Sequence, residues 1–325
     1  MAGFWKDKRV LITGYEGFLG SHLAADLVSK GAAVTGLDIL THRKETILSA
    51  DDYKMMKVVR GSVEDLKLLL KILKQNRIES VFHLAATSIV GEALGLPLKA
   101  FSTNIEGTWN ILEACRRTPQ VRSVVIASSD KAYGSHKKLP YLEGEPLCGD
   151  HPYDVSKSCA DLLANAYFHT YGLPLAITRC GNIYGPGDFN FSRLIPDAMR
   201  CLALKKTLQV RSDGEFIRDY VYVADIVRGY TRIAECLEKG RFTGEAFNLS
   251  NEEPVSVKGL LTMIEKTVPE GRFLRYKIKN AVKYEIKKQF LCSRKARKLL
   301  RWQPDDSLAS GLKKTAAWYL NYFKK

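Results

Sequence analysis

The 325-residue chain has an ordinary globular composition, with 46% hydrophobic and 10% aromatic residues, and a formal net charge of +15. This length suits two domains, or one large domain with a cap. The longest apolar runs are only strand-sized, so we expect no membrane span. The first residues also lack the apolar segment and cleavage site of a signal peptide.

Cysteine and histidine usage predicts a cytoplasmic protein without metal. The seven cysteines are scattered, odd in number and contain no Cys-x-x-Cys pair, and the six histidines show no ligand spacing. We therefore expect reduced thiols, no disulfide framework and no metal site.

The positive charge is concentrated near the C-terminus, where residues 271–325 hold 16 Lys or Arg against 3 acidic residues. Basic stretches of this kind can bind nucleic acid. Here, however, charged positions alternate with apolar ones at helical spacing over 296–302 and 312–320, which is typical of docked helices with a solvated basic face. RNA binding is therefore unlikely as the main function, and a basic surface would also steer an anionic ligand toward a cleft.

Strand and helix patterns alternate through the first half of the chain. The expected elements are a strand at 9–13, a helix at 17–30, strands at 33–37 and 57–61, a helix at 63–76, a strand at 80–84, a helix at 99–117, a strand at 123–127, a helix at 153–171 and a strand at 174–179. This alternation predicts an α/β fold with a Rossmann-type, doubly wound parallel sheet.

Three glycines follow the first expected strand and open the first helix. Gly14 permits the tight turn, Gly17 lets the backbone approach a pyrophosphate, and Gly20 allows close helix–strand packing. Asp38 ends the second strand, where its carboxylate can bind both ribose hydroxyls and would repel a 2′-phosphate. The pattern predicts NAD rather than NADP, although the basic residues at 42–44 could accommodate that phosphate if their loop folded back.

Residues after the next two strands complete this predicted site. Ser62 and Val63 are placed to flank adenine, and small residues at 84–86 can pack against the dinucleotide. We expect residues 1–178 to form the NAD-binding domain, with about 219–249 returning to its sheet. After Arg179 the pattern breaks into loops rich in glycine and proline, so residues 179–325 are expected to form mainly a smaller substrate-binding domain.

Tyr153 and Lys157 lie one turn apart on one face of an expected helix. The lysine ammonium is expected to lower the pKa of the phenol, so that Tyr153 can act as a general base toward a hydroxyl near neutral pH. Ser129, Asp130 and Lys131 precede this pair, after the fifth strand. A Tyr-x-x-x-Lys pattern alone is weak evidence for such a site, but together with the glycine loop and the Ser129-Asp130-Lys131 triplet it is strong evidence.

Together these motifs resemble the extended short-chain dehydrogenase/reductase family, in its nucleotide-sugar epimerase and dehydratase branch, over essentially the whole chain. The resemblance is carried by the glycine loop, His83-Leu-Ala-Ala86, Asn104-x-x-Gly107-Thr108, Tyr153-x-x-x-Lys157, Arg179-x-x-Asn182 and Arg218-Asp-Tyr-x-Tyr-Val-x-Asp225.

The resemblance implies three sets of site residues. The catalytic set is Ser129, Asp130, Lys131, Tyr153 and Lys157. The cofactor-binding set is Gly14, Glu16, Gly17, Phe18, Leu19, Gly20, Asp38, Ser62, Val63, Leu84, Ala85, Ala86, Asn104, Ala127, Tyr153, Lys157 and Cys180. The substrate-binding set is Thr87, Ser88, Ser129, Asn182, Arg193, Arg211 and Arg218, with the arginines as candidates for a diphosphate because guanidinium groups match phosphate geometry.

The triplet after the fifth strand favours one reaction within the branch. The 4,6-dehydratases carry Thr-Asp-Glu there, whereas Ser129-Asp130-Lys131 is similar to the CDP-glucose 4,6-dehydratases, although Arg218-Asp-Tyr departs from their usual Arg-Pro-Trp-Gln. The resemblance implies a 4,6-dehydratase acting on a nucleoside diphosphate sugar, CDP-glucose first and GDP-, dTDP- or UDP-sugars next. A 4-epimerase, which needs no acid–base pair at C5 and C6, stays open.

In a dehydratase, Asp130 is expected to be the acid and Lys131 the base, which requires a Lys131 pKa lowered by desolvation or by nearby cations. An exposed ion pair in a loop is the competing interpretation of these two residues.

We also expect a homodimer, because the helices at 104–117 and 153–171 carry more apolar residues than one buried stripe needs, among them Trp109, Leu162 and Ala166.

Overall fold

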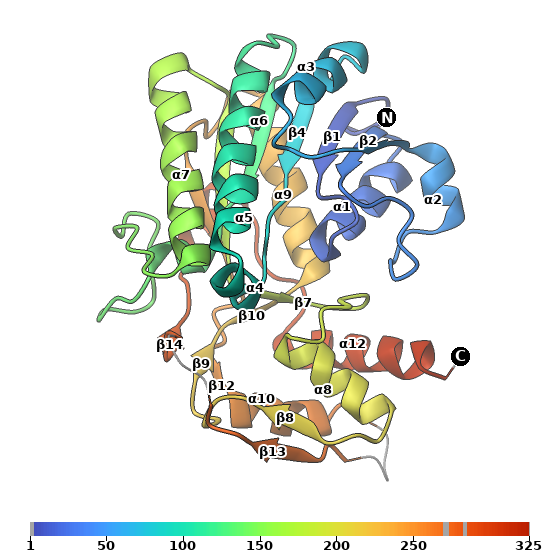
Figure 1. Ribbon diagram of the computed structural model, residues 1–325, viewed down its shortest axis with the longest axis vertical. Helices are drawn as coiled ribbons and strands as arrows, with labels where there is room; N and C mark the ends of the chain where they lie inside the picture. The colour runs from blue at the N-terminus through green and yellow to red at the C-terminus, as the bar shows by residue number, and fades with distance from the viewer. Residues whose placement is uncertain (1–2, 269–272, 282–284, 325) are drawn as a thin grey trace.

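The computed structural model describes residues 3–268, 273–281 and 285–324. A large part built on one sheet lies above a smaller part in Figure 1, and the C-terminal helix belongs to the smaller part. The large part contains the chain as far as residue 180 and three later elements, so the boundary between the parts is crossed several times.

The central sheet has seven strands in the order β11-β6-β5-β4-β1-β2-β3, and every neighbouring pair is parallel. Parallel strands with helical crossovers are what the alternating pattern predicts, so the doubly wound α/β prediction is confirmed. The strands are β1 Arg9–Thr13, β2 Ala33–Asp38, β3 Lys57–Arg60, β4 Ser80–His83, β5 Ser123–Ala127, β6 Leu175–Cys180 and β11 Ala246–Leu249.

Helices cover both faces of the sheet, and the strand alternation shows why. Val10 and Ile12 point into one apolar core with helices α1 and α9, while Leu11 points into the other core with α3, α6 and α7. Because both faces are buried, the strands are apolar nearly throughout. The helices are α1 Phe18–Ser29, α3 Leu66–Gln75, α6 Gly107–Arg116, α7 Pro152–Tyr171 and α9 Val223–Glu238.

The smaller part has its own apolar core, to which α8, α10 and α12 contribute Met199, Leu260 and Leu312. Three small sheets and the C-terminal helix complete it, and Leu312 is buried, as the interleaved pattern of the basic tail predicts. Its elements are β7 Asn182–Tyr184, α8 Leu194–Ala203, β8 Leu208–Val210, β9 Ile217–Arg218, β10 Tyr220–Tyr222, β12 Val255–Ser256, α10 Val257–Glu265, β13 Tyr276–Ile278, β14 Lys288–Gln289 and α12 Leu308–Tyr322. Helix α11 Arg294–Leu300 packs instead on β11 and α9 of the large part, and Trp302 is buried in the same core.

Two expected helices differ in detail from the structure. The helix expected at 63–76 begins only at Leu66, because the Asp65 carboxylate accepts the backbone N–H of Leu68 and caps it. The single helix expected at 99–117 is α5 Pro97–Phe101, a π-helical turn Ser102–Glu106 and α6. The short helices α2 Ala50–Met55 and α4 Val90–Gly95 and the 3-10 turn Asp130–Tyr133 complete the large part.

Within the described ranges, no helix has both the length and the apolar character needed to cross a bilayer. The same part of the chain contains no cluster of His, Cys, Asp or Glu side chains that could hold a metal ion. All seven cysteines are free, and five of them are buried.

Candidate active site

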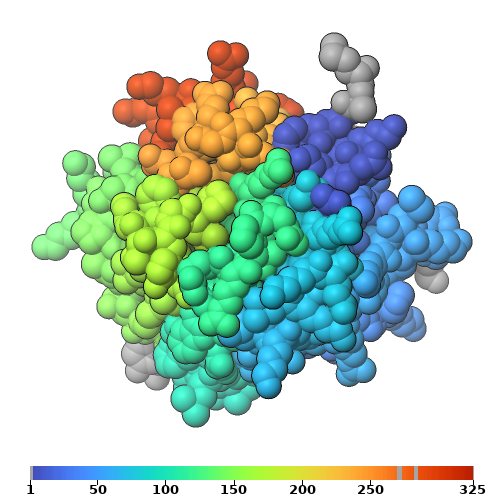
Figure 2. Space-filling view, turned by 90° about the horizontal axis from the view of Figure 1, so that it is seen from above, coloured from blue at the N-terminus to red at the C-terminus, as the bar shows by residue number. Residues whose placement is uncertain are grey.

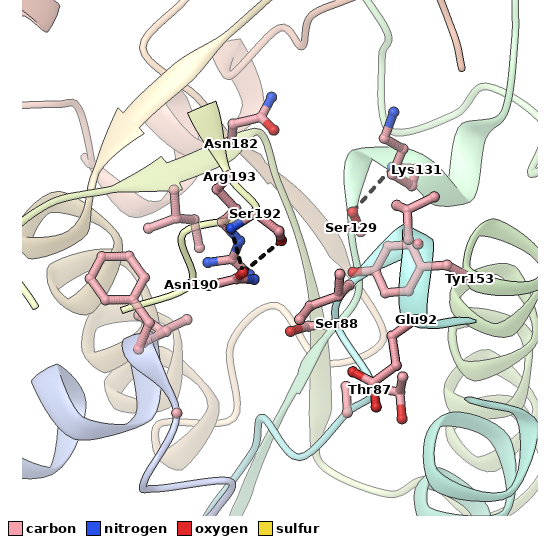
Figure 3. A pocket seen from close by; sticks show the side chains of 18 of the residues that line it. Thr87, Ser88, Glu92, Ser129, Lys131, Tyr153, Asn182, Asn190, Ser192 and Arg193 are labelled. Atoms are coloured by element: carbon pink, nitrogen blue, oxygen red, sulfur yellow. Dashed lines mark hydrogen bonds between the residues drawn. The ribbon is translucent and has the colours of Figure 1, made fainter. Parts of the chain in front are cut away.

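A cavity of about 1710 Å³ lies at the carboxyl ends of the sheet strands, between the large and the smaller part. This is where ligands bind in doubly wound sheets, because the loops after the strands meet there. Figure 3 shows two walls of it, with Thr87, Ser88, Ser129 and Tyr153 facing Asn182 and Asn190. The cavity therefore joins residues from both predicted domains.

The glycine loop forms one end of this cavity. Gly14 has a φ of 75°, which favours glycine. A Cβ on Gly20 would lie 2.1 Å from the carbonyl oxygen of Gly14, so this position requires glycine. No side chain caps the first turn of α1, and its first residues line the cavity. A helix N-terminus with free N–H groups attracts phosphate. The loop fits the pyrophosphate of a dinucleotide.

The predicted cofactor residues lie along the cavity with two exceptions. Its lining includes Gly14, Gly17, Phe18, Leu19, Gly20, Asp38, Ser62, Val63, Leu84, Ala85, Ala86, Ala127, Tyr153, Lys157 and Cys180. Glu16 and Asn104 do not line it, although both are buried.

Glu16 and Asn104 act on the loops around the site. The Glu16 carboxylate accepts the backbone N–H of His42 at 2.6 Å and the hydroxyl of Tyr53 at 2.9 Å. The Asn104 amide accepts the N–H of Thr87 at 2.8 Å and donates to the Ser156 hydroxyl at 2.8 Å. Neither side chain lines the cavity, so the assignment of these two residues to the cofactor-binding set stays a prediction. The sequence does not distinguish a contacting residue from one that holds a contacting loop.

Asp38 and Arg43 both line the end of the cavity near the glycine loop. One oxygen of the Asp38 carboxylate accepts the backbone N–H of Glu16 at 3.2 Å and the other accepts that of Leu40 at 3.1 Å. The carboxylate is thus fixed at the end of β2, as a ribose-binding residue requires. Discrimination between NAD and NADP stays a prediction, with Arg43 as the residue that could weaken it.

Tyr153, Lys157 and Ser129 meet in the cavity, but not with the expected effect on acidity. Burial raises the pKa of Tyr153 to about 12, against lowering by a hydrogen bond with Ser129 and by the charge of Arg193. Burial lowers the pKa of Lys157 to about 8, and its ammonium donates to the carbonyl of Ala127 at 2.8 Å. The pKa of Tyr153 is therefore raised and not lowered as expected, because burial of the phenol outweighs the groups that favour its ionised form.

Asp130 and Lys131 are not an exposed ion pair. They lie in the 3-10 turn after β5, both line the cavity, and Asp130 is 5% exposed. Burial raises the pKa of Asp130, whose carboxyl accepts the Ser129 hydroxyl at 3.1 Å. Burial, and next the positive charge of Arg218, lowers the pKa of Lys131. These are the directions that an acid and a base need, and the causes for Lys131 match the two that the sequence analysis required.

The predicted substrate residues lie toward the smaller part. Thr87, Ser88, Asn182, Arg193, Arg211 and Arg218 all line the cavity. Arg193 pairs with Asp188 at 3.0 Å, Arg218 pairs with Glu285 at 2.8 Å, and Arg211 donates to the carbonyl of Ser192. Protein partners hold the three guanidinium groups at one side of the cavity. The side chains of Arg193 and Arg211 remain partly exposed there.

Several cavity residues were missed from the sequence. Asp154 and Ser128 line the cavity, and each has a buried oxygen without a hydrogen-bond partner. Asn190 and Glu285 also line it, from loops whose path no local pattern indicates. Asp154 gave no usable signal in the sequence, because an acidic residue in the first turn of a helix is ordinary.

The fold and these residues define a nucleotide-sugar dehydratase or epimerase, and comparison with known proteins agrees. The chain belongs to the family described as GDP-mannose 4,6 dehydratase, whose model matches residues 11–315. It is 33% identical to CDP-glucose 4,6-dehydratase of Salmonella typhimurium over 271 residues, covering 78% of this chain and 75% of that protein. It is 30% identical to UDP-glucuronate 4-epimerase 2 of Arabidopsis thaliana over 341 residues, covering 97% and 76%.

Solved structures show the same two activities. UDP-glucose 4-epimerase of Thermotoga maritima with UDP-glucose has a TM-score of 0.87 and 27% identity, covering 97% of this chain and 99% of that one. dTDP-glucose 4,6-dehydratase of Bacillus anthracis in complex with NAD has a TM-score of 0.85 and 26% identity, covering 98% of each chain. The family is thus shown, whereas the choice between dehydration and epimerisation needs the site itself.

Replacing Gly20 by alanine is expected to weaken NAD binding at least about 100-fold, or by roughly 2.7 kcal/mol. The added methyl group would meet the Gly14 carbonyl and force the phosphate loop to move. Titration calorimetry with NAD measures the effect. The control is Gly95→Ala, where nothing lies within 4 Å of the added Cβ, and which should bind as the unchanged chain does. Equal affinities for the two variants would contradict the assignment of this loop.

Proposed function

We propose that this protein is an NAD-dependent nucleoside diphosphate hexose 4,6-dehydratase that makes a 4-keto-6-deoxyhexose, with CDP-glucose as the favoured substrate. The observation that carries the proposal is the Asp130-Lys131 pair, with Asp130 buried and Lys131 half-buried, in the same cavity as Tyr153. A 4-epimerase needs only the tyrosine and its companions. A dehydratase also needs an acid at O6 and a base at C5, which this pair can supply.

The first step oxidises the sugar at C4. Tyr153 takes the proton of the 4-hydroxyl, and Ser129 hydrogen-bonds the same oxygen. Bound NAD supplies the acceptor for the C4 hydride and later its donor, together with a positive ring charge that favours the phenolate. Lys157, anchored to the end of β5, is placed to hold the ribose on the cavity floor.

The second step removes water from C5 and C6. The new ketone acidifies the proton at C5, and neutral Lys131 accepts that proton. The C5–H electron pair forms the C5–C6 double bond while the C6–O bond breaks, and protonated Asp130 gives its proton to the departing hydroxyl. The raised pKa of Asp130 and the lowered pKa of Lys131 favour the two forms that this step consumes. Hydride then returns to C6 and the proton to C5.

The nucleotide is supported by the Ser129-Asp130-Lys131 triplet and by the Salmonella relative, which is a CDP-glucose 4,6-dehydratase. GDP-, dTDP- and UDP-hexoses are the next candidates. Incubating the protein and NAD with each of the four nucleoside diphosphate hexoses, followed by mass spectrometry, tests the proposal. The expected product from CDP-glucose is lighter than the substrate by one water. A product of unchanged mass that is a C4 epimer would instead establish the alternative 4-epimerase.

The epimerase alternative is favoured by the several relatives and solved structures that are 4-epimerases.

A non-catalytic RNA-binding role, by contrast, is supported only by the basic C-terminal region. That region forms helices docked through buried Trp302 and Leu312, and Lys314 pairs with Asp306 at 2.7 Å. Salt-dependent RNA binding without turnover of any nucleotide sugar would favour that role. The free cysteines support the cytoplasm as the compartment.

We expect the protein to be a homodimer that pairs through the outer face of α6 and α7, which lie side by side on the surface in Figure 2. Trp109 and Leu162 on these helices are 43% and 57% exposed, so both side chains are available to pack against a partner. Ile111 and Leu112 point into the core instead. Sedimentation at micromolar concentration should give the dimer mass, and Leu162→Glu should give the monomer mass. The control Leu204→Glu, at an exposed leucine after α8, should keep the dimer mass. A monomer mass for the unchanged chain would refute the dimer.

A further inference from the structure

Asp154 is a buried carboxylate that the chemistry described above does not use. It is 3% exposed, it lines the cavity, and its Oδ1 atom has no hydrogen-bond partner within the described chain. Burying a carboxylate oxygen without a partner costs free energy, so the position calls for a functional reason. The residue follows Tyr153 directly, in the first turn of α7.

The backbone holds Asp154 close to the turn that carries Lys131. The 3-10 turn Asp130–Tyr133 packs against α7. The Ser158 hydroxyl lies 2.8 Å from the carbonyl oxygen of Ala132 and 3.1 Å from that of Asp154, so both are within reach of the one proton that it can donate. This contact fixes the turn against the first turn of the helix. Lys131 and Asp154 therefore face the same cavity from two elements that are held together.

The charges around the two side chains come from several elements. The charges that act on Lys131 are those of Arg218 and of three carboxylates, Asp130, Glu285 and Asp154. The charges that act on Asp154 are those of Lys131 and His151 and of the carboxylates of Asp130 and Asp150. Burial raises the pKa of Asp154 to about 6, so it is ionised at pH 7.5. Burial also raises the pKa of Asp130, which favours the protonated form there.

These charges give Asp130 and Asp154 different roles. When elimination begins, Asp130 must be protonated to act as the acid and therefore carries no charge. Lys131, which is half-buried, must then accept a proton in the cavity, where the charge of Arg218 makes a second positive charge unfavourable. Asp154 is the buried carboxylate near Lys131 that can be ionised at that moment.

We propose that Asp154 is a positioning residue that stabilises the ammonium form of Lys131 after it takes the C5 proton and holds it until the proton returns to C5. This inference depends on the proposed dehydratase function. No atom is transferred to Asp154: the proton moves from C5 to the Lys131 amine and back. The arrangement is the base-and-orienting-carboxylate pair of other enzymes, with a lysine as the base.

The test is the pH dependence of dehydration in Asp154→Asn, which removes the charge and keeps the size. Without the carboxylate, the pKa of Lys131 falls. The rise of the dehydration rate with pH, which follows formation of neutral Lys131, should therefore shift by at least half a pH unit to lower pH. The rate at the optimum should fall at least about 10-fold, because the ammonium loses its counter-charge. A residue with only a structural role would lower the rate at every pH without moving the profile.

A second measurement does not need activity. Reductive ¹³C-methylation, with the Lys131 signal identified by its absence in Lys131→Met, reports the amine pKa by NMR titration. The Lys131 signal should titrate at lower pH in Asp154→Asn than in the unchanged protein. The control Asp150→Asn, at an exposed carboxylate that faces Asp154, should leave it unmoved. Asp154→Ala replaces Asp154→Asn if the amide variant does not fold.

The outcomes separate the inference from the function it depends on. If the unchanged protein dehydrates a nucleoside diphosphate hexose and neither the rate profile nor the amine titration moves in Asp154→Asn, the role of Asp154 is refuted and the dehydratase stands. If no nucleoside diphosphate hexose is dehydrated, the proposed function fails, and with it the catalytic role of Asp154, whatever the amine titration shows.

Discussion

Replacing Tyr153 by phenylalanine is expected to abolish turnover, with a loss of at least about 1000-fold in rate, because it removes the group that takes the proton of the 4-hydroxyl. Every later step needs the 4-ketone, so no 4-keto sugar should form at all. The measurement is trapping with borodeuteride after incubation with substrate and NAD, followed by mass spectrometry of the sugar. Tyr153→Phe should show no deuterium at C4.

Two comparisons make this result specific to the hydroxyl of Tyr153. NAD affinity by calorimetry should stay within a few-fold of the unchanged protein, because the ring that packs with Ala93 and Ala100 is retained. Tyr141→Phe is the matched control, since that buried tyrosine donates to the carbonyl of Gly134 and does not line the cavity. Turnover by Tyr153→Phe within 10-fold of Tyr141→Phe would show that another group is the base at the 4-hydroxyl.

Replacing Lys131 by methionine is expected to leave oxidation at C4 intact and to slow loss of water at least about 100-fold, because the base at C5 is gone. The 4-keto sugar that still carries its 6-hydroxyl should accumulate in single turnover and be trapped by borodeuteride. Exchange of the C5 proton with solvent deuterium, followed by NMR, should fall in parallel. Asp130→Asn should also accumulate the 4-keto sugar but keep C5 exchange, because it removes the acid and leaves the base.

This pair of variants tests the roles of Asp130 and Lys131. Loss of elimination with retained oxidation in both variants is what the acid–base pair predicts. If Lys131→Met keeps near-normal loss of water and normal C5 exchange, the lysine is not the base at C5. The dehydratase proposal would then lose its structural support, and the mass of the product would decide between dehydration and 4-epimerisation.

The sheet, its cofactor loop and the catalytic turn were predictable because short-range patterns determine them. Gly14, Gly17 and Gly20 act within seven residues of one another, and apolar strands identify a sheet covered on both faces. The Asp130-Lys131 pair could be placed in sequence, but its orientation depends on burial against α7. The lowered pKa of Lys131 depends on Arg218, which is 87 residues away in sequence.

The features that sequence patterns missed depend on contacts between distant segments. Glu16 and Asn104 occupy motif positions of the family, but their side chains hold the loops at His42 and Thr87. The pKa of Tyr153 was misjudged because burial of the phenol, which only the folded structure shows, raises it. Asp154 escaped notice because only the folded structure shows that its carboxylate is buried and faces the cavity.

The most direct test of the central claim follows one labelled atom. CDP-glucose with deuterium at C4 is incubated with the protein and NAD in ordinary water, and the product is examined by NMR and mass spectrometry. A 4,6-dehydratase moves the C4 hydride to C6, so we expect a 4-keto-6-deoxy sugar with deuterium in its C6 methyl group. Deuterium retained at C4 in a mixture of two C4 epimers that keep the 6-hydroxyl would contradict the account.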